Sequence, residues 1–249
     1  MLDSKFHDSI YAIYGFVRVA DEIVDTFHQH DKEKLFRRFC EDTYLALDNG
    51  ISTNPILNSF QDTVNKFKID RKLIDAFLKS MEMDLSFSKY EESSYEEYIY
   101  GSAEVVGLMC LKVFCQGDEK NYEKLVAPAR SLGSAFQKIN FLRDFKSDFA
   151  ERGRVYFPGI DFNNFTNDQK KEIEKEIEKE FNDAWKGVIK LPNGSKLGVS
   201  VAYIYYVTLF KKIRRIPANK IKSERIRINN IQKIILLIQT WFRYNLRLI

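Results

Sequence analysis

The stretch QKINFLRDFKSDFAERGRVYFP, residues 137–158, decides how the rest of the chain is interpreted. Asn140, Asp144 and Asp148 recur in it at intervals of four residues, within an otherwise largely apolar run. Because an α-helix has 3.6 residues per turn, this spacing places three oxygen-bearing side chains in one line along two helical turns. The stretch therefore predicts a core helix that carries a row of polar ligands.

A second acidic motif, RVADEIVD, occupies residues 18–25. Asp21 and Asp25 lie four residues apart, so a helix projects both carboxylates from one face, about 6 Å apart. Same-charge pairs at this spacing destabilise a helix by roughly a few tenths of a kcal/mol. Two such sets, each with an arginine at hand (Arg18 and Arg143), indicate a compensating cation. The alternative is that these arginines serve only as salt-bridge partners of the nearby aspartates.

The ligand chemistry of the two acidic motifs favours a hard cation. Carboxylate and amide oxygens, without histidine or cysteine, are typical ligands of Mg²⁺, and Mn²⁺ accepts the same set. Mg²⁺ usually takes only one or two carboxylates and completes its shell with water and phosphate oxygens. The motifs therefore predict a site for a di- or triphosphate held through Mg²⁺, with Mn²⁺ as a substitute.

Glycine and proline are sparse, with 11 Gly and 5 Pro among 249 residues, and the prolines separate long uninterrupted stretches. This pattern is typical of an all-α bundle and argues against a β-sandwich, which needs turn residues every ~8–12 positions. With 45% hydrophobic residues the chain can bury one sizeable core, so we expect a single domain. Helical periodicity predicts helices at about residues 8–27, 31–47, 56–67, 71–87, 94–114, 122–149, 167–190, 198–214 and 228–248.

Charge is distributed unevenly along the chain. The formal charge of +4 is too small to imply binding of nucleic acid, and we expect none. Positive charge concentrates near the C-terminus, which indicates an anionic ligand or a membrane surface, or else a solvated basic face. This basic stretch comprises Lys211, Lys212, Arg214, Arg215, Lys220, Lys222, Arg225 and Arg227.

No apolar run approaches the ~20 residues of a membrane span. Residues 234–241 are strongly apolar, and we interpret them as part of a terminal core helix rather than a membrane anchor. Residues 168–181 alternate acidic and basic side chains and predict a surface helix with a narrow apolar stripe. Cysteine spacing indicates buried, reduced thiols and no zinc site, at Cys40, Cys110 and Cys115.

Six segments resemble the squalene/phytoene synthases, a family that joins two prenyl diphosphates head to head. They occur in the family's order and cover nearly the whole chain, at residues 11–25, 81–85, 98–109, 137–158, 206–213 and 225–228. The segment 137–158, with its R-x-Y-F-P tail, is highly specific. The resemblance implies one all-α domain over residues 1–249, a helical bundle of the isoprenoid synthase type with a central cavity.

The resemblance also implies roles for individual residues that match the family's motifs. The two acidic motifs would bind Mg²⁺ from opposite sides of the cavity, through Asp21, Asp25, Asn140, Asp144 and Asp148, and the four aspartates would be catalytic. Groups near the diphosphates would be Arg18, Gln137, Arg143, Tyr206 and Arg225. Tyr98 falls where the family has a tyrosine beside the reacting carbons.

Three departures from the family pattern bear on these expectations. The chain begins a short way before Arg18, so we expect that an N-terminal segment that helps close the diphosphate end of the cavity is missing. Glu22 stands where a second Asp is more usual, and Glu104 stands where the family has a small residue. Close helix packing is expected at Glu104, so its carboxylate either alters the pocket or points outward.

The implied activity is that of a Mg²⁺-dependent prenyltransferase. We expect it to condense two geranylgeranyl diphosphates to phytoene, through a cyclopropylcarbinyl diphosphate, for carotenoid biosynthesis. The alternative enzyme is a squalene- or dehydrosqualene-type synthase that uses farnesyl diphosphate, and only a reductive squalene-type synthase needs NADPH. An alternative of another class is a non-catalytic relative that acts as an assembly or scaffold protein.

The expected location is cytoplasmic. Because C30 and C40 products partition into lipid, we expect peripheral contact with the bilayer, through the basic stretch and with an apolar tunnel mouth nearby. The sequence leaves the oligomeric state open.

Overall fold

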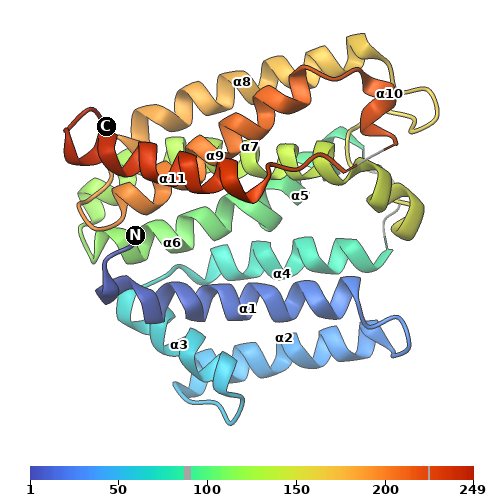
Figure 1. The fold of residues 1–249 in the computed structure, drawn as a ribbon. Helices are drawn as coiled ribbons and strands as arrows, with labels where there is room; N and C mark the ends of the chain where they lie inside the picture. Colours follow the sequence, from blue (N-terminus) through green and yellow to red (C-terminus); the bar gives the residue numbers. More distant parts are fainter. Residues whose placement is uncertain (87–90, 224) are drawn as a thin grey trace.

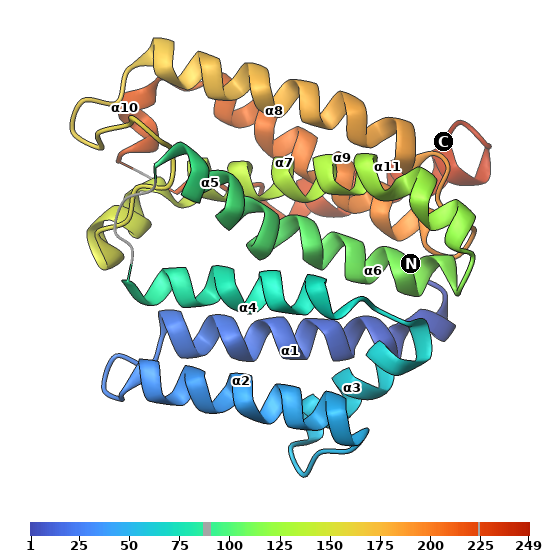
Figure 2. The ribbon, with the colours of Figure 1, turned by 180° about the vertical axis from the view of Figure 1, so that it is seen from behind.

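The computed structural model describes residues 1–86, 91–223 and 225–249. The described chain is built of helices in a single bundle, which confirms the all-α expectation (Figures 1 and 2). Helices α1–α4 form one side of the bundle, α7–α9 and α11 form the other, and α5 and α6 run between them (Figure 2). Their bounds are α1 (His7–Asp25), α2 (Lys32–Asn49), α3 (Pro55–Phe67), α4 (Arg71–Ser86), α5 (Glu92–Ile99), α6 (Val105–Cys115), α7 (Glu119–Arg152), α8 (Asn167–Val188), α9 (Lys196–Arg214), α10 (Ala218–Ile221) and α11 (Asn230–Asn245).

Capping residues explain why most helices begin and end near the predicted positions. Asn54 caps α3 by accepting a backbone N–H at 3.0 Å, and Pro55 occupies the first turn. Thr166 and Gln169 form a reciprocal capping box at the start of α8. Helix α7 is capped at its C-terminal end by Gly153, whose φ of 67° is a left-handed conformation that favours glycine.

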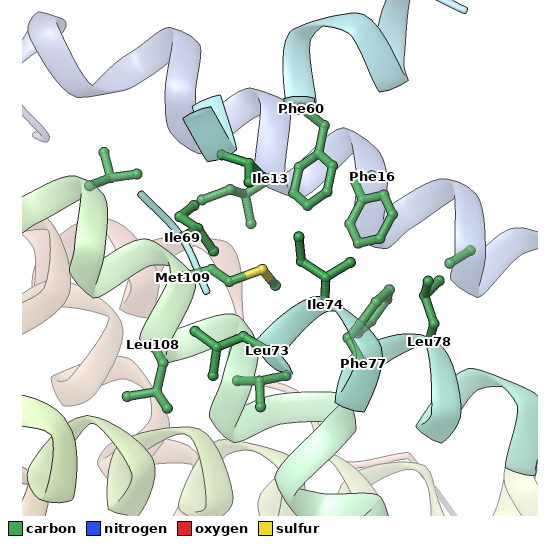
Figure 3. Packing of buried hydrophobic residues seen from close by; sticks show 14 of the residues in the cluster. Ile13, Phe16, Phe60, Ile69, Leu73, Ile74, Phe77, Leu78, Leu108 and Met109 are labelled. Atoms are coloured by element: carbon green, nitrogen blue, oxygen red, sulfur yellow. The ribbon is translucent and has the colours of Figure 1, made fainter. Parts of the chain in front are cut away.

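The first apolar core, here called the N-terminal core, fills the space between α1, α2, α3, α4 and α6 (Figure 3). Phe16 of α1 is fully buried, and its ring stacks on that of Phe60 of α3 with centroids 3.9 Å apart. Ile74 of α4 and Met109 of α6 are fully buried in the same cluster. Burial of each such side chain contributes roughly 1.5–3 kcal/mol to folding.

A second apolar cluster, the C-terminal core, lies between α5, α7, α8, α9 and α10. Leu142 of α7 and Leu209 of α9 are fully buried in it. Helix α8 contributes Ile173, Ile177 and Phe181, which are the apolar stripe expected of a charged surface helix. That prediction is confirmed, and the stripe holds α8 against the bundle.

Helices α5 and α6 are joined by a π-helical turn, η2 (Tyr100–Glu104), where one uninterrupted helix was predicted. The N–H of Val105 donates to the carbonyl of Tyr100, five residues back. The run Glu92–Cys115 is long and apolar enough to cross a membrane, so the expectation that no such run exists is wrong. However, 61% of its apolar window is buried inside the described structure, as in the core helix of a water-soluble bundle.

The C-terminal helix α11 lies on the outer surface of the bundle, against α9 (Figure 1). Its side chains Ile234, Ile235, Ile238 and Trp241 are 47% to 57% exposed. The interpretation of this segment as a terminal core helix is therefore wrong. The prediction failed because apolar spacing shows that a helix has an apolar face but not which way that face points.

Candidate active site

An apolar pocket of about 450 Å³ lies between α6, α7, α8 and α9, and of the five expected metal ligands Asn140 lies in its wall. Along α7 its wall runs from Leu125 to Asn140, roughly 22 Å of helix at 1.5 Å per residue. Most of the wall is apolar or small, as in pockets that bury hydrocarbon ligands. The polar side chains in the wall are Ser102, Gln137, Asn140 and Tyr206.

Asn140 marks the polar end of this pocket. Tyr206 of α9 donates a hydrogen bond from Oη to Asn140 Oδ1 at 3.1 Å, and Phe136 stacks on the Tyr206 ring with centroids 3.9 Å apart. Burial raises the pKa of Tyr206, so its hydroxyl stays protonated at neutral pH. Asp144 and Asp148 follow one and two helical turns beyond Asn140. The predicted row of oxygen ligands therefore begins in the pocket wall and continues past it.

Three charged residues beyond this end of the pocket form the Asp144 cluster: Arg143, Asp144 and Arg225. Arg143 Nη2 lies 2.6 Å from Asp144 Oδ2, and Arg225 Nε lies 2.6 Å from Asp144 Oδ1. Burial alone would lower the pKa of Arg143, but hydrogen bonding to Asp144 and its charge raise that pKa. Arg143 is thus a salt-bridge partner of Asp144, as the alternative interpretation of the sequence allowed, and Arg225 adds a second positive charge beside that carboxylate.

A second group, the polar centre, consists of Asp25, Asp84, Tyr98, Arg154 and Tyr156. Arg154 Nη1 lies 3.0 Å from Asp25 Oδ1 and 3.2 Å from Asp84 Oδ1. Tyr98 donates a hydrogen bond from Oη to Asp84 Oδ2 at 2.8 Å. The side chains of Arg154 and Asp84 are only 7% and 5% exposed. Burial alone would lower the pKa of Arg154, but the charges of its partners, led by Asp84, raise that pKa and keep it a cation.

The polar centre joins two acidic motifs that are far apart in the sequence. The backbone N–H of Arg154 donates to the carbonyl of Asp148 at 3.1 Å, while its side chain reaches Asp25 on α1. Burial, together with the charges of Asp84 and Asp148, raises the pKa of Tyr156. The ends of both motifs therefore meet at Arg154, on one side of the bundle.

The start of the α1 motif is more exposed. Arg18 Nη1 lies 2.8 Å from Asp21 Oδ2, and Arg18 also pairs with Glu22. The side chains of Arg18 and Asp21 are about half exposed, whereas Val17 lines the pocket. Arg18 is thus a salt-bridge partner, as the alternative reading of the sequence allowed, but of Asp21 and Glu22 rather than Asp25.

The oxygen donors suit Mg²⁺ in the company of a phosphate group. Within residues 1–86, 91–223 and 225–249, no three Asp, Glu, His or Cys side chains converge into a metal cage. Mg²⁺ needs only one or two carboxylates when phosphate and water complete its shell. The residues that could hold it are Asp21 and Asp25 on α1 and Asn140, Asp144 and Asp148 on α7.

Comparison with known proteins identifies the family. The profile of the squalene/phytoene synthases matches residues 1–232. This chain belongs to the squalene/phytoene synthase family. It is 28% identical over 250 residues to Phytoene synthase 1 of Solanum lycopersicum, covering 92% of this chain and 60% of that protein. It is 26% identical over 182 residues to 4,4'-diapophytoene synthase of Staphylococcus haemolyticus, covering 70% and 61%. The chain therefore spans about three fifths of the length of these two relatives.

Solved structures show the same fold. The dehydrosqualene synthase crystal structure superposes with a TM-score of 0.80 at 20% identity, covering 98% of this chain and 89% of that one. A squalene synthase from Alicyclobacillus acidocaldarius gives a TM-score of 0.72 at 18% identity, covering 83% and 82%. These likenesses confirm the expected isoprenoid synthase fold.

Sequence reasoning within this family missed three residues of the polar centre: Asp84, Arg154 and Tyr156. A charged residue inside an apolar run is rarely left unpaired in a core, and Asp84 in MEMDL gives that signal. Arg154 and Tyr156 belong to the R-x-Y-F-P tail that carried the resemblance. Tyr98, which was predicted to lie beside reacting carbons, is buried in the polar centre and is not part of the described pocket wall.

The structure shows how Glu104 is accommodated at a position where the family has a small residue. Glu104 does not line the described pocket, and its carboxylate pairs with Arg130 Nε of α7 at 2.5 Å. Close packing of η2 against α7 is provided instead by Gly133, where a Cβ would lie 2.8 Å from the carbonyl oxygen of Ala103. The backbone of Glu104 takes part in this close contact, since its Cα lies 3.0 Å from the same Cβ position, and Ala103 lines the pocket.

Proposed function

We propose that this protein condenses two prenyl diphosphates head to head, as a Mg²⁺-dependent prenyltransferase. The observation that carries the proposal is the junction at Asn140, where a 450 Å³ apolar pocket meets the Asp144 cluster one helical turn away. An apolar compartment beside a charged one matches the two parts of a prenyl diphosphate, a hydrocarbon chain and an anionic head.

Each part of the site has a role in this reaction. Mg²⁺, when bound, would neutralise the departing diphosphate and so assist cleavage of the allylic C–O bond. Arg143, Arg225 and Arg18 would bind the diphosphate oxygens, and Gln137 and Tyr206 would orient the group at the pocket end. The metal would be held by Asp21, Asp25, Asn140, Asp144 and Asp148.

The pocket wall would protect the reacting carbons. When the C–O bond breaks, its electron pair leaves on the diphosphate, and an allylic carbocation remains. This cation joins the double bond of the second substrate, and loss of one proton gives the cyclopropylcarbinyl diphosphate. Apolar walls exclude water that would trap the cation, and the faces of Phe136 and Tyr206 can stabilise it. We place Tyr98 as a supporting group that acts from the polar centre.

For the substrate we propose geranylgeranyl diphosphate, with phytoene as the product. The alignment with Phytoene synthase 1 of Solanum lycopersicum, which covers 92% of this chain, supports this choice. Farnesyl diphosphate is the alternative, favoured by the similarity to diapophytoene synthase and to the dehydrosqualene synthase structure. The two substrates differ by one isoprene unit, so the depth of the pocket decides between them.

Product analysis tests these proposals. The purified protein is incubated with both prenyl diphosphates and Mg²⁺, Mn²⁺ or EDTA, with and without NADPH, and the lipids are analysed by mass spectrometry. We expect phytoene with Mg²⁺, none with EDTA and no effect of NADPH. A C30 product would favour the farnesyl alternative, and squalene formed only with NADPH would indicate a reductive enzyme. Absence of product and of diphosphate binding would favour the scaffold alternative.

For the location we propose the cytoplasm, with peripheral contact to a membrane. The lipid solubility of the product and the basic stretch between residues 211 and 227 support this proposal. Fractionation of cells in low and high salt provides the test. Membrane association that high salt reverses is expected, and recovery only in the salt-resistant membrane fraction would contradict peripheral contact.

A further inference from the structure

Helix α11 presents an apolar face to solvent. Its outward side chains are spaced three and four residues apart, which places them on one side of the helix. Their exposed fractions lie between 39% and 72%. The members of this face, here called the α11 face, are Ile231, Ile234, Ile235, Leu237, Ile238, Trp241 and Phe242.

The opposite side of α11 already holds the helix to the bundle. Thr240 is buried there, and Lys233 Nζ lies 5.9 Å from the centre of the Tyr205 ring of α9. Gln239, Thr240, Phe242 and Arg243 line a groove with Ile204 of α9, so Phe242 lies at the border between the two sides of α11. Contact with the bundle is therefore made by the more polar side, and packing of the described chain does not account for the α11 face.

The charge of the surrounding sequence points to an anionic partner. Residues 196–249 contain 12 Lys and Arg and one acidic residue, a formal charge of +11. The whole chain carries 39 Lys and Arg and 35 Asp and Glu, so residues 1–195 carry 27 and 34, a formal charge of −7. The apolar face thus lies in the strongly basic part of a chain whose remainder is acidic.

We propose that α11 is an interfacial helix that docks this protein on the surface of an anionic lipid bilayer, an inference that rests on the peripheral membrane contact proposed above. An apolar face with Trp and Ile enters the boundary between headgroups and acyl chains, while Lys and Arg bind anionic headgroups. Sixteen residues span about 24 Å as a helix, less than the ~30 Å hydrocarbon core, so α11 lies along the surface instead of crossing it. A symmetric contact with a second copy would bring two basic surfaces together, which charge repulsion opposes.

Vesicle flotation tests the proposal without substrate, so its failure is distinguishable from failure of the condensation. The full chain is mixed with vesicles of phosphatidylcholine alone or of phosphatidylcholine with ~30% phosphatidylglycerol, which gives a strongly anionic surface. We expect binding to the anionic vesicles and at least about tenfold weaker binding to the neutral ones. Binding to the anionic vesicles should weaken in 0.5 M NaCl, because the salt screens charges beyond roughly 4 Å. Binding to neither kind of vesicle, or equal binding to both, would overturn the proposal.

A matched pair of variants assigns the binding to the α11 face. The test variant combines Ile234→Ser, Ile238→Ser and Trp241→Ser. The control combines Leu45→Ser and Ile51→Ser, two exposed apolar residues in and just after α2. We expect the test variant to lose at least about tenfold of the partitioning and the control to keep it. Loss in both variants, or in neither, would contradict the assignment to α11. Circular dichroism confirms that both remain helical.

Tryptophan fluorescence gives a second readout. The chain has two Trp residues, and Trp185→Phe leaves Trp241 as the reporter. Its emission should shift to shorter wavelength on adding anionic vesicles and be quenched by brominated acyl chains. Light scattering without vesicles tests the alternative that a second copy of this chain covers the α11 face. A dimer that the triple Ser variant turns into a monomer, with no change in Trp241 emission on adding vesicles, would show that a second copy covers the face and would overturn the proposal.

Discussion

The N-terminal core and the polar centre are both buried, but opposite kinds of interaction hold them. In the N-terminal core, rings and aliphatic chains such as Phe16, Phe60 and Ile74 pack against one another. In the polar centre, Arg154 and Asp84 are also buried, although less completely, and they carry charge, which costs free energy of desolvation. Substitutions should therefore act differently in the two regions, through lost packing in the first and through unbalanced buried charge in the second.

The largest expected effect is the loss of activity when the α7 row is neutralised. Asp144→Asn with Asp148→Asn should reduce turnover by about 10³-fold or more, since the groups that would hold the metal at the diphosphate are gone. The apo protein should remain folded, because Arg143 and Arg225 stay partly hydrated when Asp144 loses its charge. A cost of about 1 kcal/mol would lower the melting temperature by only ~2–4 °C.

Melting curves with Mg²⁺ and pyrophosphate separate catalysis from folding in this variant. The parent protein should be stabilised by the two ligands together, and the double variant should not. A large fall in the apo melting temperature, with no ligand effect on the parent, would mean that these aspartates hold the fold together and would refute the catalytic assignment.

The next effect concerns the stability of the polar centre. Arg154→Met should lower the free energy of unfolding by about 3–5 kcal/mol, because it removes a buried cation that pairs with the buried carboxylate of Asp84. Adding Asp84→Asn should recover part of that loss, so the two changes should not be additive. Urea denaturation measures both. A cost below about 1 kcal/mol for Arg154→Met would show that the polar centre is solvated in solution.

A smaller effect is expected in the N-terminal core. Ile74→Val removes one methyl group from a fully buried site and should cost about 0.5–1.5 kcal/mol. Turnover per folded molecule should not change, because Ile74 lies outside the pocket and the polar centre. Thermal melts and the condensation assay test the two statements together. A matched fall in turnover would show that the two regions are coupled.

The smallest effect is the slow modification of the thiols in and around the N-terminal core. Burial raises the pKa of Cys110 to about 12 and those of Cys40 and Cys115, where nearby acidic groups assist, to about 11. Iodoacetamide should therefore react slowly at pH 8 and about tenfold faster per pH unit above it. Between the unfolded pKa of ~8.5 and these values, the folded chain holds more protons, so stability should fall as pH rises. Rapid labelling at pH 8 would indicate an opened core.

The helices and the α7 row were predictable from local sequence, because periodicity and capping act over one or two turns. The row of Asn140, Asp144 and Asp148 needed only a helix to align it. The charge balance was only partly predictable. The pairs of Arg18 with Asp21 and of Arg143 with Asp144 are local, whereas other neutralising contacts cross the fold. Arg154 reaches Asp25 over 129 residues, and Arg225 reaches Asp144 over 81. Contacts at such separation depend on how helices pack, which spacing along one helix does not encode.

The orientation of helices was also beyond local pattern. Helices α8 and α11 both have one apolar face, yet α8 turns that face to the C-terminal core and α11 turns it to solvent. The stripe of α8 alternates with charges that define its outer side, whereas α11 has few charges on either side to do so. The sequence pattern therefore predicted the orientation of the apolar face correctly for α8 and wrongly for α11.

The π-helical turn η2 sets how α6 is rotated about its own axis relative to α5. It holds one residue more than an α-helical turn, so every later side chain is turned by about 100° relative to an unbroken helix. With this phase, Ser102 and Ala103 face the pocket while Gly101 packs on α4, where a Cβ would lie 2.3 Å from a carbonyl oxygen. Deleting a single residue inside Tyr100–Glu104 would restore an ordinary helix and rotate the pocket wall of α6 out of place. The pocket thus depends on an exact residue count at this turn, so a one-residue deletion there would do more damage than most substitutions.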